Sequence, residues 1–241
     1  MGKKRNSSIV AAFMCALFLL MSGCSSPAAS VSSDNSVESP SDIDQSVVSL
    51  SDIFSSDDPQ IWYGVDEIGK DADIKTLYAI ENGTISVYSF HDYKSSPNRT
   101  LGALSKISDE AFLNQVENDL ANGSYDSRYC VIDASPQLYL FTDKTGNNVA
   151  SEGVLIGPDA QEYYEKYYLN NPSGKEHFGH SGGTGLLFTG ETSKGIVYDD
   201  MWVGYDVAYQ NVTCGRYFIT RNNPSDSYIL DSFDTPNVVI Q

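Results

Sequence analysis

Positive charge is scarce in this chain of 241 residues. Lysine and arginine together number 15, against 32 aspartate and glutamate residues, so the formal net charge is −17. Proteins that bind nucleic acids need clustered lysine and arginine to displace the counterions of the phosphates. The sequence therefore predicts no nucleic-acid partner. The apolar share of 41% is still large enough for a packed core.

The sequence also lacks a hydrophobic run of the length that spans a membrane. The apolar stretch Ile9–Met21 has 13 residues without a charge, whereas a spanning helix needs roughly 20. Basic residues precede it at positions 3–5, and the small residues Ser22 and Gly23 follow it. This order is typical of a secretory signal peptide, which we place at residues 1–23.

The end of this segment reads Met21-Ser22-Gly23-Cys24. It resembles the lipobox of bacterial lipoproteins, with Met in place of the usual Leu. The resemblance implies that Cys24 is lipidated and becomes the N-terminus after cleavage, and that acyl chains such as palmitate anchor it to the cell membrane. The rest of the chain would then face the extracytoplasmic side, in the cell envelope. The alternative is an ordinary cleaved signal peptide with a cysteine nearby.

Composition divides the remainder of the chain into two parts. Residues 24–58 contain 13 serines, seven acidic residues and no lysine or arginine, which predicts a disordered, charge-extended linker. A short helical start at Ser51–Phe54, with Ser51 as its cap, is conceivable within it. Residues 59–241 contain both tryptophans and all 16 tyrosines, with 25 acidic and 12 basic residues. We expect them to form a single globular domain.

The expected fold class is α+β, mostly antiparallel β with one clear helix at about 108–122. Ser108 is a suitable N-cap, and Asp109 and Glu110 fall in the first turn, where the helix dipole favours anions. Apolar residues follow at helical spacing, and Gly123 suits the C-terminal stop. Residues 159–169 fit either a helix or a strand.

Turn residues predict two β-hairpins. Asn82-Gly83 separates strands expected at 74–80 and 84–90, because both residues tolerate positive φ. The turn 143–146, which ends in Gly, separates strands expected at 137–142 and 148–156. Further strands are expected at 128–133, 185–189, 195–198, 202–209, 216–221, 227–230 and 237–240.

Cysteine is also sparse, with four residues in the chain. Cys15 falls in the signal peptide and Cys24 at the lipobox, which leaves Cys130 and Cys214. An exported compartment permits a disulfide between these two. Two separate buried thiols are the equal alternative.

Few residues suggest catalysis. Gly179–Gly183 fits the G-x-S-x-G pattern with Ser181 as nucleophile, but that motif needs a strand before it and a helix after it. Here a loop precedes the motif and a strand follows. His177 and His180 could share a metal with Glu176, yet the chain has three histidines in all and Gly179 disfavours a helix between them. We predict no catalytic residue, no metal and no cofactor.

Aromatic side chains offer a different function, because they stack on sugars or anchor protein partners. Trp62, Tyr63, Trp202 and Tyr205 are the candidate ligand contacts, and packing within the core is the alternative. The sequence thus favours a lipid-anchored bacterial surface lipoprotein with a non-catalytic binding domain for an envelope polysaccharide or protein. The competing hypothesis is an extracellular hydrolase of envelope polymers, which would use Ser181 or paired acids.

Overall fold

The computed structural model describes residues 46–90, 99–125, 130–133, 136–157, 185–211, 215–222 and 226–241. Several sequence-based predictions fall on other residues. Cys24, Cys214, the segment 159–169 and the segment 176–181 lie outside the described residues, and for Cys130 only the backbone is described. The lipidation, disulfide and nucleophile hypotheses therefore stay predictions.

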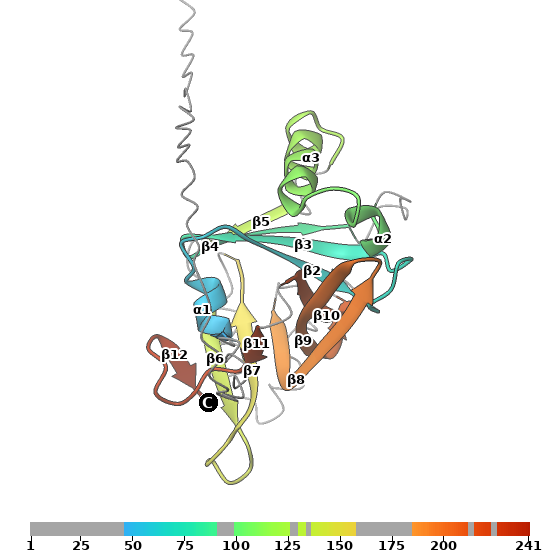
Figure 1. The fold of residues 1–241 in the computed structure, drawn as a ribbon. Coiled ribbons are helices and arrows are strands. Elements are labelled where there is room, and N and C mark those ends of the chain that lie inside the picture. The colour runs from blue at the N-terminus through green and yellow to red at the C-terminus, as the bar shows by residue number, and fades with distance from the viewer. Residues whose placement is uncertain are drawn as a thin grey trace, which may run out of the picture. The chain divides into compact units, whose positions relative to one another are not determined.

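Nearly half of the described residues form one large sheet (Figure 1). Its strands are β2 Gln60–Val65, β3 Ile74–Glu81, β4 Thr84–Ser89, β5 Cys130–Asp133, β6 Gln137–Thr142, β7 Val149–Leu155, β8 Leu186–Val197, β9 Asp200–Asn211, β10 Gly215–Arg221 and β12 Val238–Ile240. Their order is β12-β6-β7-β8-β9-β10-β2-β3-β4-β5. Neighbours pair antiparallel, except that β12 pairs parallel with β6. A separate parallel pair joins β1 Val47–Ser49 to β11 Ser227–Ile229.

The helices are α1 Leu50–Phe54, α2 Leu101–Leu104 and α3 Asp109–Ala121. The Ser108 hydroxyl accepts a hydrogen bond from the Ala111 backbone N–H at 3.1 Å, so it caps α3 as predicted. Gly123 follows the helix with φ of 78°. These elements confirm the predicted α+β class and its mostly antiparallel sheet.

Both predicted hairpins are present. Asn82 and Gly83 have φ values of 51° and 73° between β3 and β4, and Gly146 has φ of 73° between β6 and β7. Two details differ from the sequence prediction. β8 joins the expected strands 185–189 and 195–198 across an irregularity in its pairing with β9. Strand β2 was also not predicted from the sequence.

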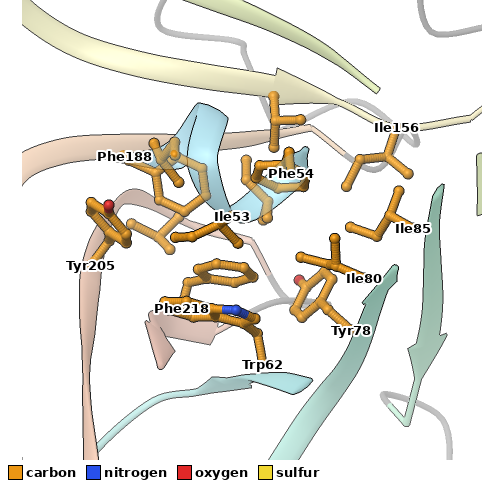
Figure 2. Packing of buried hydrophobic residues seen from close by; sticks show 14 of the residues in the cluster. Ile53, Phe54, Trp62, Tyr78, Ile80, Ile85, Ile156, Phe188, Tyr205 and Phe218 are labelled. Atoms are coloured by element: carbon orange, nitrogen blue, oxygen red, sulfur yellow. The ribbon is translucent and has the colours of Figure 1, made fainter. Parts of the chain in front are cut away.

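Two cores cover opposite faces of the central strands. One core packs α1 against inward side chains such as Trp62, Tyr78 and Phe218 (Figure 2). The other packs α2 and α3 against the opposite face, around Tyr63 and Trp202. Alternate residues of a strand point to opposite faces, so strands covered on both sides carry nearly continuous hydrophobic runs.

The first core gathers side chains from both ends of the strand order. Ile85 of β4 and Ile156, which follows β7, belong to the same cluster and face each other in Figure 2. The sheet therefore curls so that distant strands share one core, with Ile53 and Phe54 of α1 packed inside it.

The predicted linker boundary at residue 58 is wrong. Residues 46–58 take part in the fold, and Leu50 and Ile53 are completely buried. Ser49, rather than Ser51, caps the short helix. The Ser/Asp-rich composition suggested a linker, but Leu50, Ile53 and Phe54 have the spacing i, i+3 and i+4 and form one buried helical face.

Candidate functional site

The aromatic residues predicted as ligand contacts lie in the two cores instead. Trp62, Tyr63, Trp202 and Tyr205 are each at most 1% exposed. Trp62 stacks on Phe218 with ring centroids 4.6 Å apart, whereas Tyr63 meets Trp202 edge to face at 5.6 Å on the other side of the sheet. Side chains buried this completely offer no surface to a ligand, so the prediction is wrong for all four.

A groove of about 850 Å³ opens at the end of the sheet where β2 begins and β10 ends. The first two turns of α3 form one wall, and the β1–β11 pair forms the opposite wall. The lining residues are Val48, Pro59, Gln60, Ile61, Glu81, Asp109, Glu110, Leu113, Asn114, Thr220, Arg221, Asn222, Asp226 and Tyr228. We refer to this feature below as the groove.

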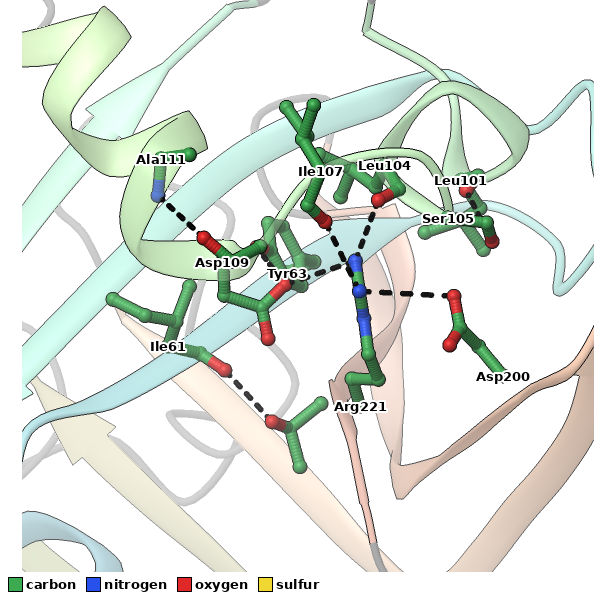
Figure 3. Close-up of polar contacts among 12 residues, drawn as sticks. Ile61, Tyr63, Leu101, Leu104, Ser105, Ile107, Asp109, Ala111, Asp200 and Arg221 are labelled. Atoms are coloured by element: carbon green, nitrogen blue, oxygen red, sulfur yellow. Dashed lines mark hydrogen bonds and ion pairs between the residues drawn. The ribbon is translucent and has the colours of Figure 1, made fainter.

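Arg221, at the end of β10, positions the α3 wall (Figure 3). Its guanidinium donates to the backbone carbonyls of Leu104, at 2.8 Å, and Ile107, at 3.1 Å. It also pairs with Asp109 of α3 at 3.1 Å and with Asp200 of β9 at 3.7 Å. One planar group thereby joins the α2–α3 connection, the start of α3 and two strands.

Tyr63 of β2 contacts the start of α3 as well. Its hydroxyl donates to Asp109 Oδ1 at 2.8 Å. Burial, followed by the nearby charge of Asp109, raises the pKa of Tyr63, so the phenol stays a neutral donor. Burial also raises the pKa of Asp109, although Tyr63 and Arg221 act in the opposite direction. The Arg221–Asp109 pair is therefore part of the architecture, and Arg221 has little capacity left for a ligand.

The opposite wall is built from segments far apart in the sequence. Val48 pairs with Tyr228 in the parallel register of β1 and β11. The hydroxyl of Ser46 donates to Asp226, and the amide of Asn222 donates to the hydroxyl of Tyr228. Burial and the charge of Asp226 raise the pKa of Tyr228 to about 12, so this phenol is neutral as well.

The groove carries an excess of negative charge. Glu81 and Glu110 are exposed and take part in no ion pair among the described residues, and Asp226 is bonded to a neutral hydroxyl. Arg221 is the single cation in the lining, and Asp109 and Asp200 already pair with it. Between the carboxylates lie amide side chains and the half-buried apolar side chains of Val48, Ile61 and Leu113. Such a surface suits a ligand with positive charges on aliphatic stems.

This groove was not predicted from the sequence, although part of one wall was. Asp109 and Glu110 were recognised as first-turn acids of a helix. Nothing local shows that this turn lies beside the ends of β2, β10 and β11, because that arrangement depends on pairings over 100 residues apart. The one sequence signal for the groove is that acidic residues stand at the ends of predicted elements, as Glu81, Glu110 and Asp226 do.

The described residues lack two further features. They contain no helix with the length and apolar character needed to cross a membrane. They also hold no group of three or more histidine, cysteine or acidic side chains placed to share a metal ion.

Comparisons of the chain with known protein families, with characterised proteins and with solved structures found no match.

Proposed function

We propose that the protein is a lipid-anchored bacterial surface lipoprotein whose domain binds a basic segment of an envelope protein. The observation that carries the proposal is the groove, with three carboxylates that no described cation neutralises. The lipobox-like sequence ending at Cys24 supports the anchor, and the Ser/Asp-rich residues that follow it suit a spacer.

Charge favours a cationic partner. Glu81 at the end of β3, Glu110 in α3 and Asp226 just before β11 approach the groove from different parts of the chain, so a bound lysine or arginine can meet a carboxylate from more than one side. Their attraction for a basic segment accelerates association and falls as salt increases. The half-buried aliphatic side chains between them can pack against the stems of lysine or arginine.

The lining argues for a protein partner over a polysaccharide. Sugar binding commonly relies on exposed aromatic faces that stack on the rings. Among the lining residues the sole aromatic side chain is Tyr228, which is 9% exposed and bonded to Asn222. Neither tryptophan lines the groove, so its described lining has no exposed aromatic ring on which a sugar could stack.

The proposal is tested by titrating the detergent-solubilised full chain with three probes in a calorimeter. The probes are a lysine/serine decapeptide, a glutamate/serine decapeptide of the same length and a neutral oligosaccharide. We expect binding of the lysine peptide alone, with an affinity that weakens as salt rises. Binding of the oligosaccharide, or equal binding of both peptides, would contradict the proposal.

A further inference from the structure

Two acidic side chains are buried together behind the β1–β11 wall of the groove. Glu152 of β7 is 0% exposed and Asp231, shortly after β11, is 4% exposed. The Asp231 backbone N–H donates to Glu152 Oε2 at 2.9 Å, and the two carboxyl groups are hydrogen-bonded to each other. Two ionised carboxylates this close in a core would repel strongly, so one of them holds a proton.

The surrounding donors show which carboxyl is ionised. Asp231 accepts the Ser51 backbone N–H at 2.8 Å and the Ser51 hydroxyl at 2.5 Å. Glu152 Oε1, by contrast, is buried and has no hydrogen-bond partner among the described residues. Asp231 is therefore the carboxylate, and Glu152 is the neutral acid that donates to it.

The pKa directions agree with this assignment. Burial raises the pKa of Glu152 to about 9. Burial alone would raise the pKa of Asp231 too, but the hydrogen bonds from Glu152 and Ser51 hold it below its ordinary value. Glu152, Asp231 and Ser51 are called the carboxyl clasp below.

The carboxyl clasp joins the groove wall to the sheet. Ser51 lies in α1, directly after β1, and Asp231 lies directly beyond β11, whereas Glu152 belongs to the large sheet. Tyr205 of β9 adds a second attachment, because its hydroxyl lies 2.8 Å from the Ile229 carbonyl and 3.3 Å from the Val48 carbonyl. No other side-chain carboxyl among the described residues is buried to this extent.

We propose that the proton shared by Glu152 and Asp231 holds α1 and the β1–β11 wall against the sheet, so that pH regulates how firmly the groove is formed. The physiological meaning of this regulation rests on the proposed function of the groove. The clasp itself can be measured without any ligand, so either proposal can fail without the other.

The direction of the pH effect follows from linkage. When the clasp opens, Glu152 meets water and regains its ordinary pKa of 4.5, so the closed state binds the proton more tightly. Closure is therefore weakened progressively as pH rises from about 4.5 to about 9, and opening becomes about tenfold more frequent per pH unit in that window. Asp231 acts oppositely, since its stabilising ionised form is lost as pH falls below its ordinary 3.8. Closure is firmest near pH 4.

The two tyrosines that face the clasp do not change charge in this window. Tyr205, from β9, has a raised pKa because of burial and then the charge of Glu152, and Tyr228, from β11, has a pKa of about 12. Asp52 of α1 is exposed and accepts hydrogen bonds from Ser49. We therefore attribute the change in clasp closure between about pH 5 and pH 9 to Glu152.

The test is hydrogen exchange on the full chain between about pH 5 and about pH 8.5. The probes are amides of α1 and its cap, including Ser55, whose N–H donates to the Ser51 carbonyl at 2.9 Å. Their protection factors should fall about tenfold per pH unit in the wild type. Glu152→Gln, which keeps a donor for Asp231 but cannot ionise, should remove this slope. Glu191→Gln, an exposed change on β8, should keep it.

Three results would overturn the proposal. The first is a slope in Glu152→Gln equal to that of the wild type. The second is a Glu152 carboxyl that titrates near 4.5 in the wild type by carbon-13 NMR, a measurement that remains decisive even if the variant does not fold. The third is a change in protection at constant pH on adding millimolar Ca²⁺, because the two carboxyls would then hold a cation in place of the proton.

Discussion

At the scale of residues, Arg221 contributes more contacts to the groove than any of its acids. Its fork-shaped guanidinium meets two backbone carbonyls and two carboxylates, and it lies 5.2 Å from the centre of the Trp202 ring. Lysine offers a single ammonium group and could not reproduce this set of contacts. Arg221 therefore determines where α3 begins relative to the sheet.

Replacing Arg221 by Met should strongly destabilise the protein. Asp109 and Asp200 would stay partly buried without their cation, and two carbonyls would lose a donor. We expect the free energy of unfolding to fall by about 3 kcal/mol, the lower end for a broken buried pair because Arg221 is itself 21% exposed. Urea denaturation monitored by tryptophan fluorescence measures this change.

The control is Arg216→Met in the same strand. Arg216 is exposed, and its guanidinium lies over the ring of its neighbour Tyr217. Its loss should change the unfolding free energy by no more than about 0.5 kcal/mol. Equal losses of unfolding free energy in the two variants would show that the contacts of Arg221 with α3 and β9 do not stabilise the fold.

At the scale of elements, the sequence predicted what local backbone chemistry determines. The turn at Asn82-Gly83 and the cap at Ser108 were predicted correctly. Asn and Gly tolerate the positive φ of the turn by themselves, and the Ser108 hydroxyl accepts the hydrogen bond of an N–H only three residues away. Helix α1 was assigned to a linker, since its apolar face is stabilised only by strands that follow much later. The groove escaped prediction for the same reason.

Because helix α1 lies between residues 46 and 59, truncation of the N-terminus tests where the folded domain begins. A fragment of residues 46–241 should fold, whereas residues 59–241 should not. The shorter fragment loses Leu50, Ile53 and Phe54 from the core, each worth roughly 2–5 kcal/mol, which together approach the whole stability of a typical domain. Near-ultraviolet circular dichroism and urea titration distinguish the two. Matching unfolding midpoints would mean that α1 is dispensable.

At the scale of the whole molecule, we propose two separate roles for the acidity. Residues 25–45 contain acidic residues and no lysine or arginine, as suits the proposed spacer. The described part of the fold places Glu81, Glu110 and Asp226 in one groove, where no described cation pairs with them. Under the proposed function, a lipid anchor at Cys24 would keep the domain in the envelope, where a basic segment can reach the groove.

The anchor is tested by Cys24→Ala. We expect the wild-type protein in the membrane fraction and the variant in the soluble fraction, because the acyl chains would be absent. Cys15→Ala, within the signal peptide, is the matched control and should leave the protein with the membranes. Retention of the Cys24 variant in the membrane fraction would refute lipid anchoring.

The central claim is that the groove binds a cationic segment, and its most direct test is a charge comparison at equal net charge. The lysine peptide is titrated into Glu81→Gln/Glu110→Gln and into Glu67→Gln/Glu191→Gln, a double variant of exposed residues outside the lining. Losing two pairs of about 0.5–1 kcal/mol each should weaken binding about fivefold or more in the groove variant. The control variant should bind like the wild type. Equal weakening in both would show attraction to overall charge, and the groove would not be the binding site.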